Sequence, residues 1–156
     1  MGMAQVSSKR AFSDPCPWHA PRVHRLDKGE LMRCLAELAW APHAMLHNPQ
    51  LSWREIDATT VEVSAESQAG AARVRLIFEN CDIARVEADD RPRMVGRRII
   101  PTRWHGRCCD YREVNGCRIP TRAVVNWLLP DGPFDYWRGR VTAFGIKRLD
   151  LGKPTR

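Results

Sequence analysis

Histidine and cysteine side chains gather in one stretch of the chain and raise the question of a zinc site. His105, Cys108 and Cys109 lie close together, and Cys117 follows further on. The surrounding residues predict a strand, on which His105 and Cys109 share one face while Cys108 points to the other. Zinc requires all of its ligands about 2.0–2.3 Å from one point. We therefore expect packing or surface side chains here and no bound metal.

Two further pairs of residues have types that do chemistry. His43 and His47 have the i, i+4 spacing that chelates a metal on a helix, but nearby prolines leave barely one helical turn. Asp89 and Asp90 have the types of an acid–base pair, but adjacent residues at a strand end point apart. The sequence has no Gly-x-Ser-x-Gly nucleophile motif, Gly-rich phosphate loop or Cys/His dyad. We expect no catalytic residue and no cofactor.

Aromatic side chains in the second half of the chain are the remaining candidates for a binding site. Such side chains pack into the core in most proteins, and an apolar pocket that they line is the functional alternative. The residues expected to contact a lipophilic ligand are Trp104, Trp127, Tyr136, Trp137 and Tyr111.

Length and composition indicate one globular domain. The chain has 156 residues, of which 44% are hydrophobic and 28% charged, and this size buries a core without help from disulfides or metal. No apolar run reaches the ~18 residues of a membrane span, and the N-terminus lacks the apolar stretch of a signal peptide. We expect a cytoplasmic protein whose six cysteines are reduced.

The net charge of +7 is concentrated in one segment. Residues 91–122 carry nine arginines against only Asp110 and Glu113. Such a cluster is typical of proteins that bind nucleic acid or an anionic surface. Arginine also outnumbers lysine along the whole chain, as codon bias in a GC-rich genome produces, so the cluster alone does not make nucleic acid the favoured partner.

The first part of the chain predicts an arm followed by a single helix. Residues 1–25 are rich in proline and show no sustained period, which indicates a disordered or loosely packed arm. Asp27 and Glu30 have the spacing of a capping box, so we expect a helix over 27–41. An apolar stripe follows at i, i+4, i+7. We expect it to pack on a sheet, and its residues are Leu31, Leu35 and Leu38.

From Trp53 onward the apolar period becomes two, which predicts strands. A three-residue loop, Asn80-Cys-Asp82, would pair Glu79 with Ile83, Phe78 with Ala84 and Leu76 with Val86. Residues 89–102 contain two prolines and a glycine and are expected to be a basic connector. The β domain as a whole spans 26–148, and 149–156 is a tail.

Asn115-Gly116 is the strongest turn signal in the chain and sets the register of the second half. A two-residue type I′ turn pairs Val114 with Cys117, and Trp104 then lies opposite Trp127. The next turn, Pro130-Asp-Gly-Pro133, would place Tyr136 opposite Trp127 and complete an aromatic row. Inward-pointing arginines in that register predict a bulge at 137–139.

Four segments, at 35–42, 53–58, 110–122 and 132–139, resemble an uncharacterised bacterial family. The first segment reads Leu-Ala-Glu-Leu-Ala-Trp-Ala-Pro, and the last reads Gly-Pro-Phe-Asp-Tyr-Trp-Arg-Gly. The paired strands around Asn-Gly also resemble the lipoprotein-carrier (Lol-type) fold, a curved antiparallel half-barrel that carries lipophilic cargo. The resemblance implies strands before the helix, where this chain has its proline-rich arm. It therefore implies a C-terminal portion with an uncovered sheet edge, and self-association through that edge.

We expect a mainly β (α+β) fold, a curved antiparallel sheet or half-barrel with one amphipathic helix on its apolar face. The expected function is non-catalytic binding of a lipophilic ligand on the concave face. Two alternatives stay open: nucleic-acid or anionic-surface binding through 91–122, and a fragment of an enzyme whose site is incomplete here.

Overall fold

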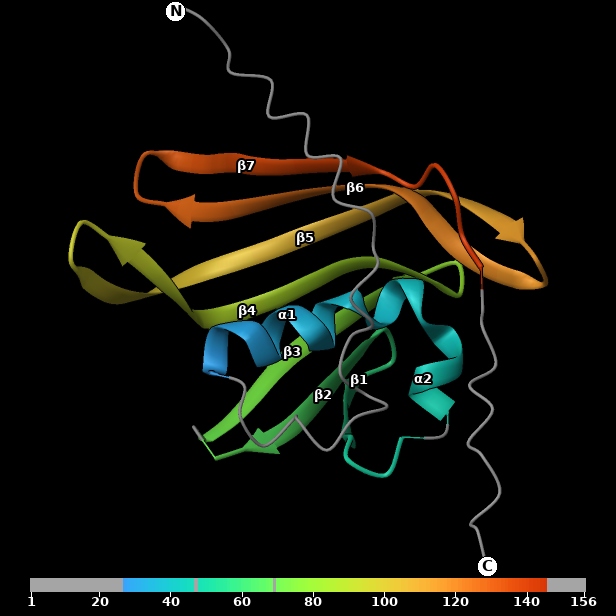
Figure 1. The fold of residues 1–156 in the computed structure, drawn as a ribbon, viewed down its shortest axis with the longest axis horizontal. Coiled ribbons are helices and arrows are strands. Elements are labelled where there is room, and N and C mark those ends of the chain that lie inside the picture. The colour runs from blue at the N-terminus through green and yellow to red at the C-terminus, as the bar shows by residue number, and fades with distance from the viewer. Residues whose placement is uncertain (1–26, 47, 69, 146–156) are drawn as a thin grey trace, which may run out of the picture.

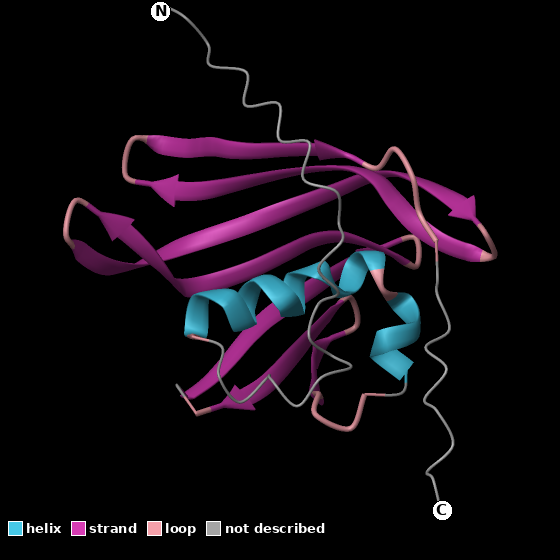
Figure 2. Ribbon diagram, in the orientation of Figure 1, coloured by secondary structure: helices cyan, strands magenta, loops and turns pink. Residues whose placement is uncertain are grey.

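The computed structural model describes residues 27–46, 48–68 and 70–145, which form one curved antiparallel sheet with helices on one side (Figures 1 and 2). This confirms the expected fold class. The expected arm and tail, 1–25 and 149–156, lie outside the described residues. The helices are α1 (Lys28–Ala36), the 3-10 helix η3 (Glu37–Trp40) and α2 (Pro42–Leu46). The strands, which neighbour one another in chain order, are β1 (Ser52–Asp57), β2 (Thr60–Ser67), β3 (Gly70–Glu79), β4 (Asp82–Val95), β5 (Arg98–Val114), β6 (Cys117–Leu129) and β7 (Gly132–Arg140).

The helical segment begins as predicted but changes form before it ends. Asp27 caps α1, because its Oδ1 accepts the backbone N–H of Glu30 at 2.8 Å. The Glu30 carboxylate forms an ion pair with Arg33 at 3.0 Å. The helix tightens to 3-10 geometry at η3, and Ala41 leaves the helical region because a residue before proline disfavours it. Pro42 then starts α2, since proline suits a first helical position.

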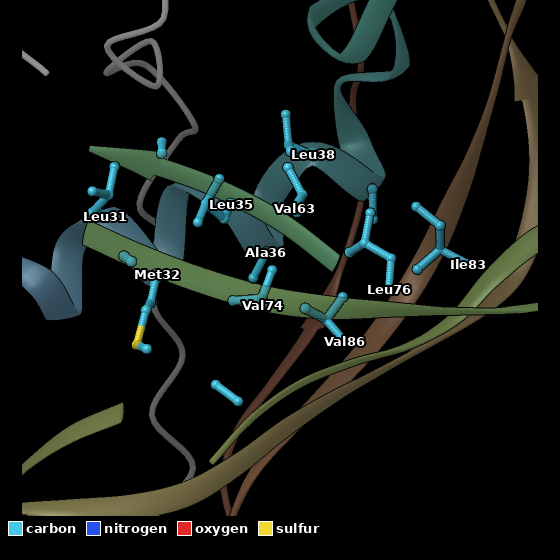
Figure 3. Packing of buried hydrophobic residues seen from close by; sticks show 14 of the residues in the cluster. Leu31, Met32, Leu35, Ala36, Leu38, Val63, Val74, Leu76, Ile83 and Val86 are labelled. Carbon is cyan, nitrogen blue, oxygen red and sulfur yellow. The ribbon is translucent and has the colours of Figure 1, made fainter. Parts of the chain in front are cut away.

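The apolar stripe of the helix packs against the sheet, as predicted. Leu31, Leu35 and Leu38 are fully buried. Helix α1 contacts β2, β3 and β4, and Figure 3 shows the stripe over their side chains. We call this side of the sheet the inner face. The strand residues that build the core there include Val63, Val74, Leu76 and Val86.

The outer face carries polar side chains in the same alternation. His105 pairs with Asn126, as the register predicted. The amide of Asn126 donates to Asp135 at 2.8 Å. Partial burial lowers the pKa of His105. The cross-strand row that runs over all seven strands is Arg54, Glu62, Arg75, Glu87, His105, Asn126 and Asp135.

The β5–β6 hairpin confirms the prediction made from Asn115-Gly116. Both turn residues have positive φ, 51° and 76°, as a type I′ turn requires. Val114 pairs with Cys117 and Trp104 with Trp127. The turn matches the twist of its strands, so a local signal determines a long register.

The predicted loop between β3 and β4 is wrong in length. Glu79 pairs with Asp82 across a two-residue turn of Asn80 and Cys81, and Phe78 pairs with Ile83. A bulge after this pair restores the expected pairing of Leu76 with Val86. The tight turn suits the strand twist, and the bulge returns the apolar side chains to the inner face.

The turn between β3 and β4 also predicts a stabilising substitution. Cys81 has φ 67°, a left-handed conformation that favours glycine. We expect Cys81→Gly to raise the free energy of unfolding by about 1 kcal/mol, because it removes the Cβ strain. Urea denaturation would measure the change. Cys81→Ser is the control, since it removes the thiol but keeps the Cβ, and an equal effect of both variants would contradict the explanation.

Residues 89–102 are not a connector but the paired ends of two long strands, which corrects the prediction. β4 and β5 pair out to Val95 and Arg98 around a Gly96–Arg97 turn. Pro92 lies opposite Pro101. Counted from the turn, this is a non-hydrogen-bonded pair. The N–H that each proline lacks would therefore not have bonded to the partner strand.

The β6–β7 register also differs from the prediction. Leu129 pairs with Gly132 and Trp127 with Phe134, so the loop is two residues shorter than expected. Gly132 has φ 113°, which the tight turn needs. The bulge falls at Tyr136, between Asp135 and Trp137, rather than at 137–139.

Within the described residues the sheet is open, with β1 and β7 as its edge strands. Edge strands present unpaired N–H and C=O groups that pair with other chains. Self-association through an edge stays a prediction. No helix of the described ranges is long and apolar enough to cross a membrane.

Candidate ligand-binding surface

Three of the predicted residues meet on the inner face, each on a different strand. Trp104 from β5 lies opposite Trp127 from β6. The Trp127 ring stacks on Tyr136 from β7, with centroids 5.3 Å apart and planes at 22°. The indole N–H of Trp104 donates to the Tyr136 hydroxyl at 2.8 Å. Phe134, rather than Tyr136, lies opposite Trp127 in the observed register. The bulge at Tyr136 still allows its ring to stack on Trp127, so the three predicted residues meet.

Next to the buried Trp104 lies a partly exposed group of aromatic side chains that we call the aromatic shelf: Trp127, Phe134, Tyr136 and Trp137. Phe134 and Trp137 pair with inner-face residues of β6, so they share that face. The exposed fractions of Phe134, Tyr136 and Trp137 are 54%, 41% and 37%. The shelf is therefore an accessible apolar surface, unlike the core beneath α1.

Gly139 makes room for the shelf at its end. A Cβ built on this residue would lie 2.1 Å from Cη2 of Trp137. The indole of Trp137 therefore lies flat over the backbone of β7, where any side chain would displace it.

Two arginines of β4 lie over the aromatic row. The Arg91 guanidinium lies 4.6 Å from the ring centroid of Trp104 and 6.0 Å from that of Trp127. Arg93 lies 5.8 Å from the ring of Trp127. These are cation–π distances. Burial lowers the pKa of Arg91, an effect that Tyr136, Glu30 and Glu37 oppose.

Neither Arg91 nor Arg93 forms an ion pair within the described part of the chain. Their two guanidinium groups are thus positive charges with aromatic neighbours and without a carboxylate at ion-pair distance, although Glu30 and Glu37 act on Arg91 from further away. The sequence prediction missed both residues because it treated 89–102 as a connector. Their i, i+2 spacing was the available signal, since such residues on a strand share one face.

Tyr111 does not join this group. Its hydroxyl donates to the backbone oxygen of Ile83 at 3.0 Å, and burial raises its pKa. It packs against the core. Seven positions along one strand separate it from Trp104, which is about 23 Å at the usual rise. We assign Tyr111 a packing role.

The acidic pair Asp89 and Asp90 is engaged in ion pairs. Asp89 accepts two hydrogen bonds from Arg75, at 2.6 and 2.9 Å, and this arginine lowers the pKa of its carboxyl. Asp90 forms an ion pair with Lys28. A carboxylate held ionised by arginine is a poor proton donor near neutral pH.

The cysteine-rich stretch remains dispersed. Cys108 is buried, which raises its pKa to about 12, and Cys109 pairs with Arg122 on the neighbouring strand. In the described ranges no three His, Cys, Asp or Glu side chains come together as metal ligands. His43 is exposed on α2, and His47 lies outside the described residues.

The arginine cluster at 91–122 is divided by the fold. In its second part, ion pairs join Arg118 to Asp82 at 2.7 Å and Arg122 to Asp110 at 3.0 Å. In its first part, near the β4–β5 turn, the arginines lack such partners among the described residues. Four arginines without an ion pair to a described residue therefore gather near the β4–β5 turn, although Arg107 and Arg112 of the same segment also have none.

Comparison with known proteins adds a family without adding an activity. No curated protein and no solved structure matches the chain. The model of a family of unknown function, DUF6544, matches residues 8–139. The match agrees with the resemblance to an uncharacterised family and begins before the segments that carry it. The chain belongs to this family of unknown function, DUF6544.

Proposed function

We propose that the protein is a non-catalytic, cytoplasmic domain that binds an amphiphile with an apolar body and an anionic head. The apolar body lies on the aromatic shelf, and the head faces Arg91 and Arg93. Carriage of a lipophilic ligand is what the resemblance to the half-barrel carrier fold implies.

The observation that carries the proposal is the pair of unpaired guanidinium groups beside exposed aromatic rings. The acids that act on Arg91, Glu30 and Glu37, are themselves paired with Arg33. A partly buried arginine without an acid at ion-pair distance is costly, and a bound carboxylate or phosphate would supply that partner. Exposed aromatic residues offer a large apolar area with little side-chain entropy to lose. The two features together select a ligand with both properties.

A fluorescent fatty acid, displaced by dodecanoate or by dodecanol, tests the proposal. The two competitors differ in their heads, so we expect dodecanoate to bind at least about tenfold more tightly, as charge-assisted hydrogen bonds to arginine imply. Trp137→Ala should weaken binding about tenfold, as loss of a central aromatic contact does. Because Trp137 is partly exposed, this variant should fold normally.

Trp53→Ala is the matched control. Trp53 is the same residue type at 42% exposure, but it lies on β1 at the other edge of the sheet. Its loss should change fatty-acid binding less than twofold. The proposal would be wrong if the protein showed no saturable fatty-acid binding, or if Trp137→Ala and Trp53→Ala weakened that binding equally. Salt-sensitive binding of duplex DNA without fatty-acid binding would support the nucleic-acid alternative instead.

A further inference from the structure

The far end of the β4–β5 hairpin stands apart from the rest of the sheet. The pairing of β3 with β4 ends at Glu87, and the pairing of β5 with β6 begins at Trp104. Residues 91–102 therefore pair only with each other, and we call them the free ribbon. Figure 1 shows its tip, drawn in olive, reaching beyond helix α1 at the left.

The outer face of the free ribbon is wholly apolar. Met94 lies opposite Ile99, and Pro92 lies opposite Pro101. Directly opposite residues share a face, and the next pair of the same face follows two residues on. Met94 and Ile99 are 65% and 66% exposed, so two large apolar side chains point into water.

The ribbon is also strongly basic. It contains Arg91, Arg93, Arg97 and Arg98 and no acidic residue. Arg97 lies in the turn and Arg98 beside it, and both are exposed. Neither forms an ion pair with any described residue. Apolar side chains and unpaired cations thus occupy the same tip.

We propose that the free ribbon docks the protein on an anionic lipid bilayer. The outer face, with Met94 and Ile99, enters the boundary between headgroups and acyl chains. Arg97 lies in the turn, and Arg98 lies on the other face of the tip opposite Val95, so their long side chains reach lipid phosphates around the inserted residues. The residues that make this contact are not among those that would hold a ligand on the aromatic shelf, so the two proposals can be tested separately.

A bilayer fits this tip better than a nucleic acid does. A duplex offers phosphates to the arginines but takes in aliphatic side chains only by unstacking its bases, whereas an anionic membrane offers both kinds of partner without that cost. The ribbon lies in the interface rather than crossing the membrane. Its outer strand edges carry unpaired N–H and C=O groups, which need water or headgroups as partners.

Flotation with vesicles measures the docking. Vesicles of phosphatidylcholine and phosphatidylglycerol at roughly two to one supply the anionic surface, and pure phosphatidylcholine is the comparison. We expect the wild-type chain to float with the first and not with the second. The double variant Arg97→Gln/Arg98→Gln should lower partitioning about thirtyfold, at about fivefold for each arginine near the surface. Met94→Ser/Ile99→Ser should lower it at least about tenfold.

Matched variants distinguish the contribution of the tip from the effects of net charge and of exposed apolar side chains elsewhere. Arg73→Gln/Arg112→Gln removes the same charge from exposed positions elsewhere, and Leu46→Ser removes an aliphatic side chain that is 78% exposed. Both should float like the wild type, and so should Trp137→Ala, which tests independence from the shelf. Circular dichroism of each variant checks that the fold is intact.

Three results would overturn the proposal. The first is equal flotation with both kinds of vesicle. The second is wild-type flotation of both tip variants. The third combines two measurements: the wild type does not float with either kind of vesicle, and sedimentation shows that it is an oligomer which Met94→Ser/Ile99→Ser converts into a monomer. That result would make the outer face of the ribbon a contact between copies of the chain.

Discussion

Replacement of Trp104 by alanine is expected to lower the free energy of unfolding by about 3–5 kcal/mol, the range for a buried large aromatic side chain. Trp104 is 3% exposed and joins the core beneath α1 to the aromatic shelf. The substitution removes the ring that lies beneath the Arg91 guanidinium and opposite Trp127, and it leaves the Tyr136 hydroxyl without its indole donor. Urea denaturation followed by far-UV circular dichroism measures the change without relying on tryptophan fluorescence.

Trp53→Ala supplies the comparison for Trp104, because Trp53 lies on an edge strand at 42% exposure. Trp53→Ala should lower the free energy of unfolding by about 1 kcal/mol, well below the effect of Trp104→Ala. Trp104→Phe should fall between the two, since it keeps a ring but loses the hydrogen bond to Tyr136. A cost below about 1 kcal/mol for Trp104→Ala would show that the indole is not enclosed in solution.

Leu35→Ala is expected to cost about 2–5 kcal/mol, the usual range for truncation of a buried leucine. Leu35 is the middle residue of the helix stripe and is fully buried between α1 and the sheet. The helix lies directly on the core, so the cavity would open where α1 meets β3. Equilibrium denaturation in urea gives the change, and the slope of the transition checks that unfolding stays two-state.

Leu46→Ala is the control for the helix prediction. Leu46 belongs to α2 and is 78% exposed, so its loss should change the free energy of unfolding by less than about 0.5 kcal/mol. If both leucine variants cost the same, the stripe would not be the packing face of the helix. A cost below about 0.5 kcal/mol for Leu35→Ala would mean that the stripe faces water.

Local patterns predicted the parts of this fold whose geometry is set by neighbours in the chain. The cap at Asp27, the leucine stripe and the type I′ turn at Asn115-Gly116 all follow from a few consecutive residues. The turn is the clearest case, because two residues with positive φ oblige their flanking strands to pair in one register. The placement of Trp104 opposite Trp127 followed from that turn alone.

Bulges and strand ends were beyond the reach of such patterns. A bulge inserts one residue wherever the packed face requires it, so Tyr136 and the residue after Ile83 could not be located from alternation. Prolines suggested a connector at 89–102, but Pro92 and Pro101 face each other where no hydrogen bond is lost. Whether a proline is tolerated depends on its partner across the strand.

The sequence by itself determined that this protein is a β domain with one capped helix, an apolar inner face and a basic segment. Those properties depend on residue type and period, which act over a few positions along the chain. Only the tertiary structure decided that Arg91 and Arg93 lie over the aromatic row and that Tyr111 does not join it. It also decided which arginines have acidic partners and which stand unpaired on the free ribbon. The physical reason is that these contacts join separate strands, so they depend on registers and bulges that no single segment specifies.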